Sequence, residues 1–253
     1  MESVNLDFEE CLRQVRDALS KVCDPELDEP VTDLGFVQEV SVAADGDVSI
    51  RFRLPTYWCS ANFAYLMAAD MRDAIASLPW IRKVNIELVD HFTSAEVSTG
   101  VSHGKSFLHS FQSEAEEDLE AVRLIFRRKS FQKRQESLLR HLLGRGETIS
   151  AVVSMPLAAL EQSPLDRDGA VLRARYLQAR ALLGFDDRPN ETVFHDTDGK
   201  ALQAGEFSEY LLHLRRVRLN TEFNSAICRG LLEARYGAKQ ENPLIQIEVA
   251  RRQ

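Results

Sequence analysis

The chain has 253 residues, of which 44% are hydrophobic and 28% charged, as expected of a globular protein with one large core or two small ones. No run of about eighteen apolar residues occurs, so the sequence predicts no transmembrane helix and no membrane partner. Residues 1–92 carry 8 basic and 17 acidic side chains, which argues against nucleic acid as a partner because phosphate contacts need clustered Lys and Arg.

The N-terminus and the cysteines indicate the compartment. Residues 1–10 are acidic and lack the basic and apolar pattern of a signal peptide. The four cysteines, Cys11, Cys23, Cys59 and Cys228, form no CxxC pair, and they are too few for a disulfide scaffold. We therefore expect a cytoplasmic protein whose thiols are free.

The first region predicts a helix followed by a hairpin. Apolar residues recur at steps of four and three over residues 8–22, and Asp24-Pro25 predicts the end of this helix. Residues 36–42 lead into Asp45-Gly46, which is typical of a hairpin turn. Residues 48–54 then alternate apolar and polar side chains, as in a strand with one buried face.

A second helix and a third strand complete the predicted domain. Apolar residues lie on one side of a helix over residues 60–78, and residues 84–88 alternate again. The order α-β-β-α-β predicts an α+β fold in which helices pack on a three-stranded sheet, within a domain of residues 1–90.

Beyond this domain the sequence predicts a linker and then helices. Residues 91–113 are rich in Ser, Thr, Gly and His and suggest a linker or binding arm, although the spacing of their histidines matches no common metal site. Residues 114–253 predict an all-α domain with a break or kink near Ser130 and with separate helices at 207–219 and 221–236.

Cys59 is the strongest candidate for chemistry. It lies at the start of the second predicted helix, where unpaired N–H groups and the helix dipole stabilise a thiolate. The carboxylates of Asp24 and Glu26 would complete a mixed sulfur and oxygen site for iron. The alternative for Asp24, and the favoured one for Asp33, is structural, because such residues accept backbone hydrogen bonds in turns.

Several motifs occur in an order that resembles a known family. Asp24-Pro25-Glu26 precedes Asp33-Leu34-Gly35, and after the hairpin Thr56-Tyr57-Trp58-Cys59 leads into the second helix. This arrangement over residues 8–90 resembles the SufT- and PaaD-type iron–sulfur cluster assembly domain, fused here to a helical extension of no recognised type. The sequence departs from the family pattern in having Tyr57 and Trp58, rather than Pro and Gly, before the cysteine, and Ser60 after it.

The resemblance implies a metallochaperone that matures metal cofactors and is not itself an enzyme. Its metal site would consist of Cys59, Asp24 and Glu26 and would hold transient iron or an iron–sulfur cluster, while Tyr57, Trp58 and Thr56 would contact the partner. PaaD-type members are associated with multicomponent oxygenases, so the expected client is a metalloenzyme such as a di-iron monooxygenase or its iron–sulfur reductase. A homo-oligomer is one candidate state.

Two other hypotheses remain open. The chain could instead be a non-catalytic adaptor or assembly chaperone that binds its client through the helical half, in which case Cys59 would be incidental. An enzyme with a cysteine nucleophile is the weakest alternative, because the motif includes no partner histidine.

Overall fold

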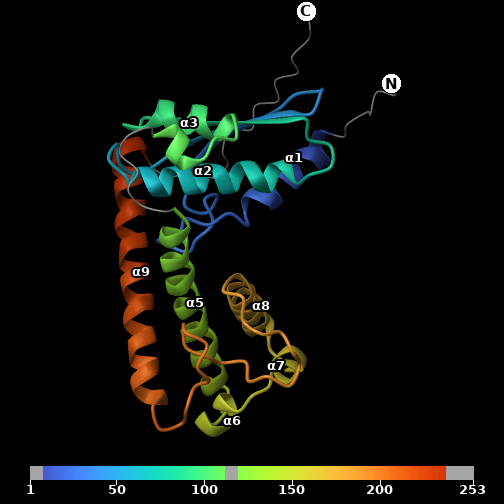
Figure 1. Ribbon diagram of the computed structural model, residues 1–253, viewed down its shortest axis with the longest axis vertical. Coiled ribbons are helices and arrows are strands. Elements are labelled where there is room, and N and C mark those ends of the chain that lie inside the picture. Colours follow the sequence, from blue (N-terminus) through green and yellow to red (C-terminus); the bar gives the residue numbers. More distant parts are fainter. Residues whose placement is uncertain (1–7, 112–118, 238–253) are drawn as a thin grey trace, which may run out of the picture. The chain divides into compact units, whose positions relative to one another are not determined.

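The computed structural model describes residues 8–111 and 119–237 (Figure 1). They divide into two compact units, which are described separately. The N-terminal unit comprises the described residues up to Leu119 together with those from Ser225 onward, and the helical unit comprises residues 120–224. The predicted start of the helical region at residue 114 lies outside the described residues.

The N-terminal unit has the predicted α-β-β-α-β order around a three-stranded sheet. Strand β2 lies in the centre, antiparallel to β1 and parallel to β3, and α2 forms the crossover that a parallel pair requires. The α+β prediction is confirmed. The elements are α1 (Phe8–Leu19), β1 (Val37–Val42), β2 (Asp47–Arg53), α2 (Ala61–Ala76) and β3 (Lys83–Val89).

Strand alternation places one face of the sheet in the core. Val48, Ile50 and Phe52 of β2 are buried, whereas Arg51 points to the exposed face and forms ion pairs with acidic residues on both neighbouring strands. Gly46 closes the hairpin at φ 86°, and a Cβ there would lie 2.6 Å from a backbone oxygen. Only glycine therefore fits this turn.

Two helices occupy the segment predicted as a linker. Helix α3 (Ser94–Ser102) contacts β3 and α2, and it is followed by α4 (Phe107–Ser110). The hydroxyls of Ser98 and Ser102 accept hydrogen bonds from backbone N–H groups of β3, at 3.0 and 3.1 Å. The serines that suggested a linker thus provide hydrogen-bond acceptors for backbone N–H groups of the edge strand β3. Buried backbone N–H groups need such partners.

The helical unit is built on long helices with their own core. Its elements are α5 (Leu119–Gly144), α6 (Ile149–Val153), α7 (Leu157–Gln162), α8 (Arg167–Leu182) and α9 (Phe207–Tyr236), the last of which continues into the N-terminal unit. The core centres on Phe131, Tyr176 and Phe194, all fully buried. The Tyr176 hydroxyl donates to the Val193 carbonyl at 2.7 Å, which satisfies the one polar atom of that ring.

Two details of the helical prediction are wrong. Helix α5 runs without a break past Ser130, because its polar stretch is supported by buried contacts: Phe131 is fully buried, and the Gln135 side chain donates to the His195 carbonyl at 2.8 Å. The two helices predicted at 207–219 and 221–236 form the single helix α9. Within the described ranges, no helix combines the length and hydropathy needed to cross a membrane.

Candidate functional site

Cys59 lies where the loop after β2 turns into α2. The residue is half-buried and packs against the core of the N-terminal unit. The hydroxyl oxygen of Thr56 lies 3.2 Å from the Cys59 Sγ and accepts the Trp58 backbone N–H at 3.2 Å. Either the hydroxyl or the thiol can donate in this contact, and only the hydroxyl can donate when the sulfur is a thiolate. Thr56, predicted as a partner contact, is thus a neighbour of the sulfur.

His91 is hydrogen-bonded to the same loop. Its Nε2 lies 2.8 Å from the Cys59 carbonyl oxygen, and its Nδ1 accepts the Thr93 backbone N–H at 3.2 Å. The proton therefore sits on Nε2 and is donated to the Cys59 carbonyl. Burial is the main cause that lowers the pKa of His91, which favours this neutral form. The sequence pattern gave His91 no such role, because its partner is a backbone atom distant in sequence.

Asp24 organises the loop between α1 and β1. The side chain is buried, and its Oδ1 accepts the backbone N–H groups of Glu26 and Leu27, each at 2.8 Å. Burial raises the pKa of Asp24 to about 6, although the two hydrogen bonds act in the opposite direction. One oxygen of the Asp24 carboxyl therefore has the structural role in a turn that the sequence offered as the alternative. Glu26 is half-buried beside it, and Asp33 is exposed at the end of the same loop.

The last turns of α9 bring a second thiol to this region. Cys228 is half-buried and packs against the same core as Cys59. Burial first, and then the negative charges of Asp24, Cys59 and Glu26, raise the pKa of Cys228 to about 11. This raised pKa keeps the Cys228 thiol protonated near neutral pH. The sequence did not reveal this, since Cys228 carries no local motif.

An exposed aromatic patch, defined as Tyr57, Trp58 and Phe92, flanks Cys59. The Trp58 ring is 75% exposed, and its centroid lies 4.9 Å from that of Tyr57 and 5.5 Å from that of Phe92. The Phe92 backbone N–H donates to the Tyr57 carbonyl at 3.2 Å, which joins the two loops that carry the patch. Two of its three members were predicted as partner contacts, and Phe92 is an addition. Exposed clusters of this kind are typical of binding surfaces.

The donor types around Cys59 suit iron, but they do not form a closed cage. Two thiols supply soft ligands, and two carboxyls supply hard ones. Among the described residues, no three His, Cys, Asp or Glu side chains are grouped closely enough to hold a metal ion by themselves.

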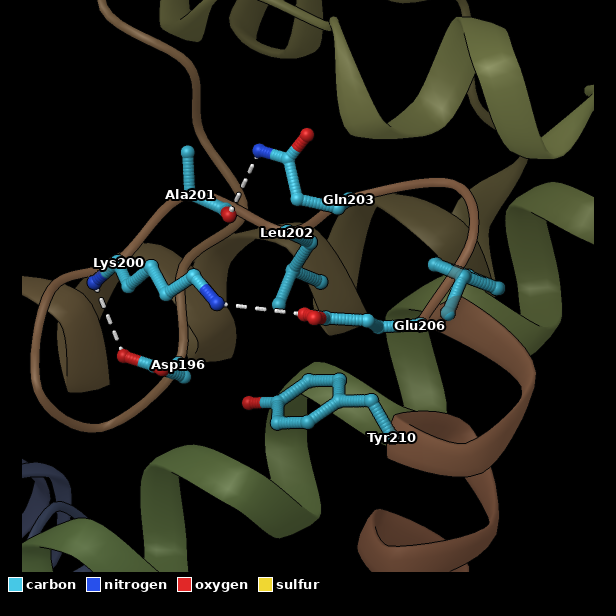
Figure 2. A pocket seen from close by; sticks show the side chains of 8 residues that line it. Asp196, Lys200, Ala201, Leu202, Gln203, Glu206 and Tyr210 are labelled. Atoms are coloured by element: carbon cyan, nitrogen blue, oxygen red, sulfur yellow. Dashed lines mark hydrogen bonds and ion pairs between the residues drawn. The ribbon is translucent and has the colours of Figure 1, made fainter.

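A hollow in the helical unit has a different character (Figure 2). It has a volume of about 50 Å³ and lies between the loop at Asp196 and the start of α9. Figure 2 shows the Lys200 ammonium reaching across it to the Glu206 carboxylate, at 3.3 Å. Its charged side chains Lys200 and Glu206 thus pair with each other, and none of the residues that line it is Cys or His. It offers no chemistry comparable to that around Cys59.

The fold and the site together define a small α/β domain that presents a half-buried thiol at a loop–helix junction beside an aromatic patch. The model of the family described as "Iron-sulfur cluster assembly protein" matches residues 12–88. Over 83 residues, 32% of this chain, the sequence is 30% identical to the Fe-S protein maturation auxiliary factor YitW of Bacillus subtilis and covers 79% of that protein. Through this domain, the chain belongs to the iron–sulfur cluster assembly protein family.

Two further relatives share only this domain. The chain is 32% identical over 77 residues to the Fe-S cluster assembly factor HCF101, chloroplastic, of Arabidopsis thaliana, which is 30% of this chain and 14% of that protein. It is 32% identical over 74 residues to the iron–sulfur cluster carrier protein of Mycobacterium tuberculosis, which is 29% of this chain and 19% of that protein. The chain thus spans less than a fifth of these two relatives, and no solved structure matches it.

Proposed function

We propose that this protein carries iron, as a cluster or as iron atoms, on the Cys59 sulfur and delivers it to a client metalloenzyme. The observation that supports this most is the half-buried Cys59, whose sulfur lies 3.2 Å from the Thr56 hydroxyl oxygen within a domain of the assembly family. Asp24 and Glu26 would assist as oxygen donors. The proposed role is that of a metallochaperone, which carries iron as cargo and does not convert a substrate.

The residues around the sulfur have distinct tasks in this proposal. Thr56 stabilises the ionised sulfur by donating its hydroxyl hydrogen, and His91 fixes the loop by donating to the Cys59 carbonyl. The aromatic patch would dock the client beside the sulfur. Because the site is open, ligands of the client can displace those of the carrier one at a time, which suits release.

The client we propose is an oxygenase component, namely a di-iron monooxygenase or its iron–sulfur reductase. Support comes from the resemblance of residues 8–90 to PaaD-type domains. The four free cysteines fit a reducing compartment, and the cytoplasm is the one we propose.

The test is anaerobic reconstitution of the full chain with iron and sulfide, followed by transfer to an apo-ferredoxin as acceptor. Cys59→Ala should bind little iron and sulfide and should transfer none, because the principal sulfur ligand is gone. Cys23→Ala is the matched control, since Cys23 is also half-buried and lies beside Asp24. Unchanged iron content in Cys59→Ala would contradict the proposal.

An adaptor that binds its client through the helical unit is the second candidate. It is favoured by apolar side chains that this unit exposes on α5 and α9, including Ile125 at 53%, Leu212 at 55% and Phe223 at 66%. This alternative predicts that Cys59→Ala leaves client activation unchanged and that residues 120–224 carry the binding.

A further inference from the structure

Asp90 directly follows β3 and has a backbone conformation that residues with a Cβ seldom adopt. Its φ is 56°, in the left-handed region. His91 and Phe92 come next, and each donates a hydrogen bond to the loop that carries Cys59. The His91 Nε2 lies 2.8 Å from the Cys59 carbonyl oxygen, and the Phe92 backbone N–H donates to the Tyr57 carbonyl at 3.2 Å. The turn at Asp90 therefore directs two neighbouring donors to the same loop.

The end of α9 binds Asp90 through its side chain and its backbone. The Tyr236 hydroxyl donates to the Asp90 carboxylate at 2.6 Å. Arg235 pairs with the same carboxylate at 2.7 Å and also donates to the Asp90 carbonyl at 3.1 Å. A strained conformation persists only where surrounding contacts determine it, and these three contacts do so for Asp90.

The two residues that bind Asp90 are themselves attached to the N-terminal unit. Leu232, one turn before Tyr236, is 8% exposed and belongs to the core of that unit. The guanidinium carbon of Arg53, the last residue of β2, lies 3.8 Å from the centroid of the Tyr236 ring, as in a cation–π contact. The Tyr236 hydroxyl is therefore presented from a fixed ring.

We propose that Tyr236 and Arg235 are positioning residues, which hold Asp90 in its left-handed conformation and thereby hold the Cys59 loop, residues 54–60, in place for iron transfer. This inference rests on the proposed function. The helical extension would then act on the sulfur of the assembly domain without binding iron itself. Without these contacts Asp90 would return to a negative φ, and the donors that follow it would leave the loop.

Alkylation of the reduced, iron-free full chain by iodoacetamide tests the position of the loop, with the rate at Cys59 followed by peptide mass spectrometry. We expect the double variant Tyr236→Phe/Arg235→Gln to react about three times faster than wild type, because a loosened loop exposes a half-buried sulfur. A rate equal to that of wild type would overturn the inference.

Arg229→Gln is the matched control, because Arg229 forms a different attachment of the α9 end. Its guanidinium pairs with Glu29 and donates to the Asp33 carbonyl at 3.2 Å, on the loop between α1 and β1. The alkylation rate at Cys59 should stay at the wild-type value, and circular dichroism should show an intact fold in each variant. Equal acceleration in Arg229→Gln would mean that any loosening of α9 exposes the sulfur, which would also overturn the inference.

A pair of substitutions at Asp90 separates conformation from packing. Asp90→Ala and Asp90→Gly both lose the carboxylate, but only glycine accepts a φ of 56° without steric cost. We expect alkylation at Cys59 to be about threefold faster in Asp90→Ala and close to the wild-type rate in Asp90→Gly. The His91 Nε2 proton, which the Cys59 carbonyl protects from water, should give a proton NMR signal in Asp90→Gly and lose it in Asp90→Ala. Equal behaviour of the two variants would contradict a conformational role.

Transfer to the apo-ferredoxin acceptor connects the position of the loop with iron. We expect the double variant Tyr236→Phe/Arg235→Gln to transfer about five times more slowly than wild type, because a misplaced loop lowers the fraction of productive encounters. Unchanged transfer despite faster alkylation would show that these residues do not serve the carrier. Neither alkylation nor the His91 signal involves iron, so this inference can fail while Cys59→Ala still loses its iron. If Cys59→Ala instead keeps its iron, the carrier proposal fails whatever the alkylation rates are.

Discussion

Asp24 is a carboxyl group whose surroundings favour its neutral form. The side chain is 6% exposed and accepts two backbone hydrogen bonds through one oxygen. Burial outweighs these bonds and raises its pKa to about 6. The folded chain therefore keeps a proton between about pH 4 and pH 6 that the unfolded chain has released, and stability must fall as pH rises through this window.

Asp24→Asn removes the ionisation and keeps an oxygen that can accept both N–H groups. We expect the free energy of unfolding of the variant, relative to wild type, to increase between pH 4 and pH 7 by up to about 3 kcal/mol. Urea unfolding at a series of pH values measures it. Asp24→Ala should show the same pH dependence but lower stability than Asp24→Asn at every pH, since two N–H groups lose their acceptor. A wild type that gains stability relative to Asp24→Asn over this range would show that the carboxylate is favoured instead.

Trp58 separates the carrier from the adaptor hypothesis. Trp58 and Phe223 are both exposed, at 75% and 66%, but Phe223 lies in the helical unit. Each change to Ala should alter stability by less than about 0.5 kcal/mol, because little area is buried. We expect Trp58→Ala to slow transfer to the acceptor about tenfold and Phe223→Ala to leave it unchanged. The reverse pattern would favour the adaptor.

At the scale of elements, the end of α9 is part of the N-terminal core. Leu232 is 8% exposed within that core, whereas its neighbour Leu231 is 44% exposed. Leu232→Ala should lower the free energy of unfolding of the N-terminal unit by about 2 kcal/mol, through lost burial and an unfilled cavity. Leu231→Ala should cost less than about 0.5 kcal/mol. Equal effects in denaturant titrations would show that this segment does not pack as described.

The elements whose signals are local could be predicted from the sequence. The alternation over residues 48–54 and the Asp45-Gly46 turn define the hairpin by themselves, and Cys59 is recognisable from the loop–helix junction that it occupies. The serines of α3 suggested a linker because their partners cannot be recognised in the local sequence. Their hydroxyls accept hydrogen bonds from backbone N–H groups of β3.

The rest of the site depends on contacts between distant segments. Arg229 of α9 donates to the Asp33 carbonyl, and His91 reaches Cys59 through a backbone carbonyl. Neither contact leaves a periodic pattern in the sequence. The continuity of α5 past Ser130 likewise depends on Gln135 bonding to a carbonyl sixty residues later. Tertiary contacts of this kind override local propensity.

For the whole molecule, the two units have separate hydrophobic cores. Phe52 and Leu232 belong to the core of the N-terminal unit, and Phe131 and Tyr176 belong to that of the helical unit. A chain with two cores need not unfold in a single transition. A substitution in one core is then expected to affect mainly the unit that contains it.

Phe131→Ala tests this independence. Removing a fully buried ring should destabilise the helical unit by about 3–5 kcal/mol, because both transfer energy and a cavity are involved. Amide hydrogen exchange should accelerate in α5 and α8 while the amides of β2 keep their protection, since these belong to the other core. Leu232→Ala should give the opposite pattern and serves as the matched control. Equal acceleration in β2 and α8 by either variant would mean that the cores unfold together, and the continuous helix α9 would then be the element that couples them.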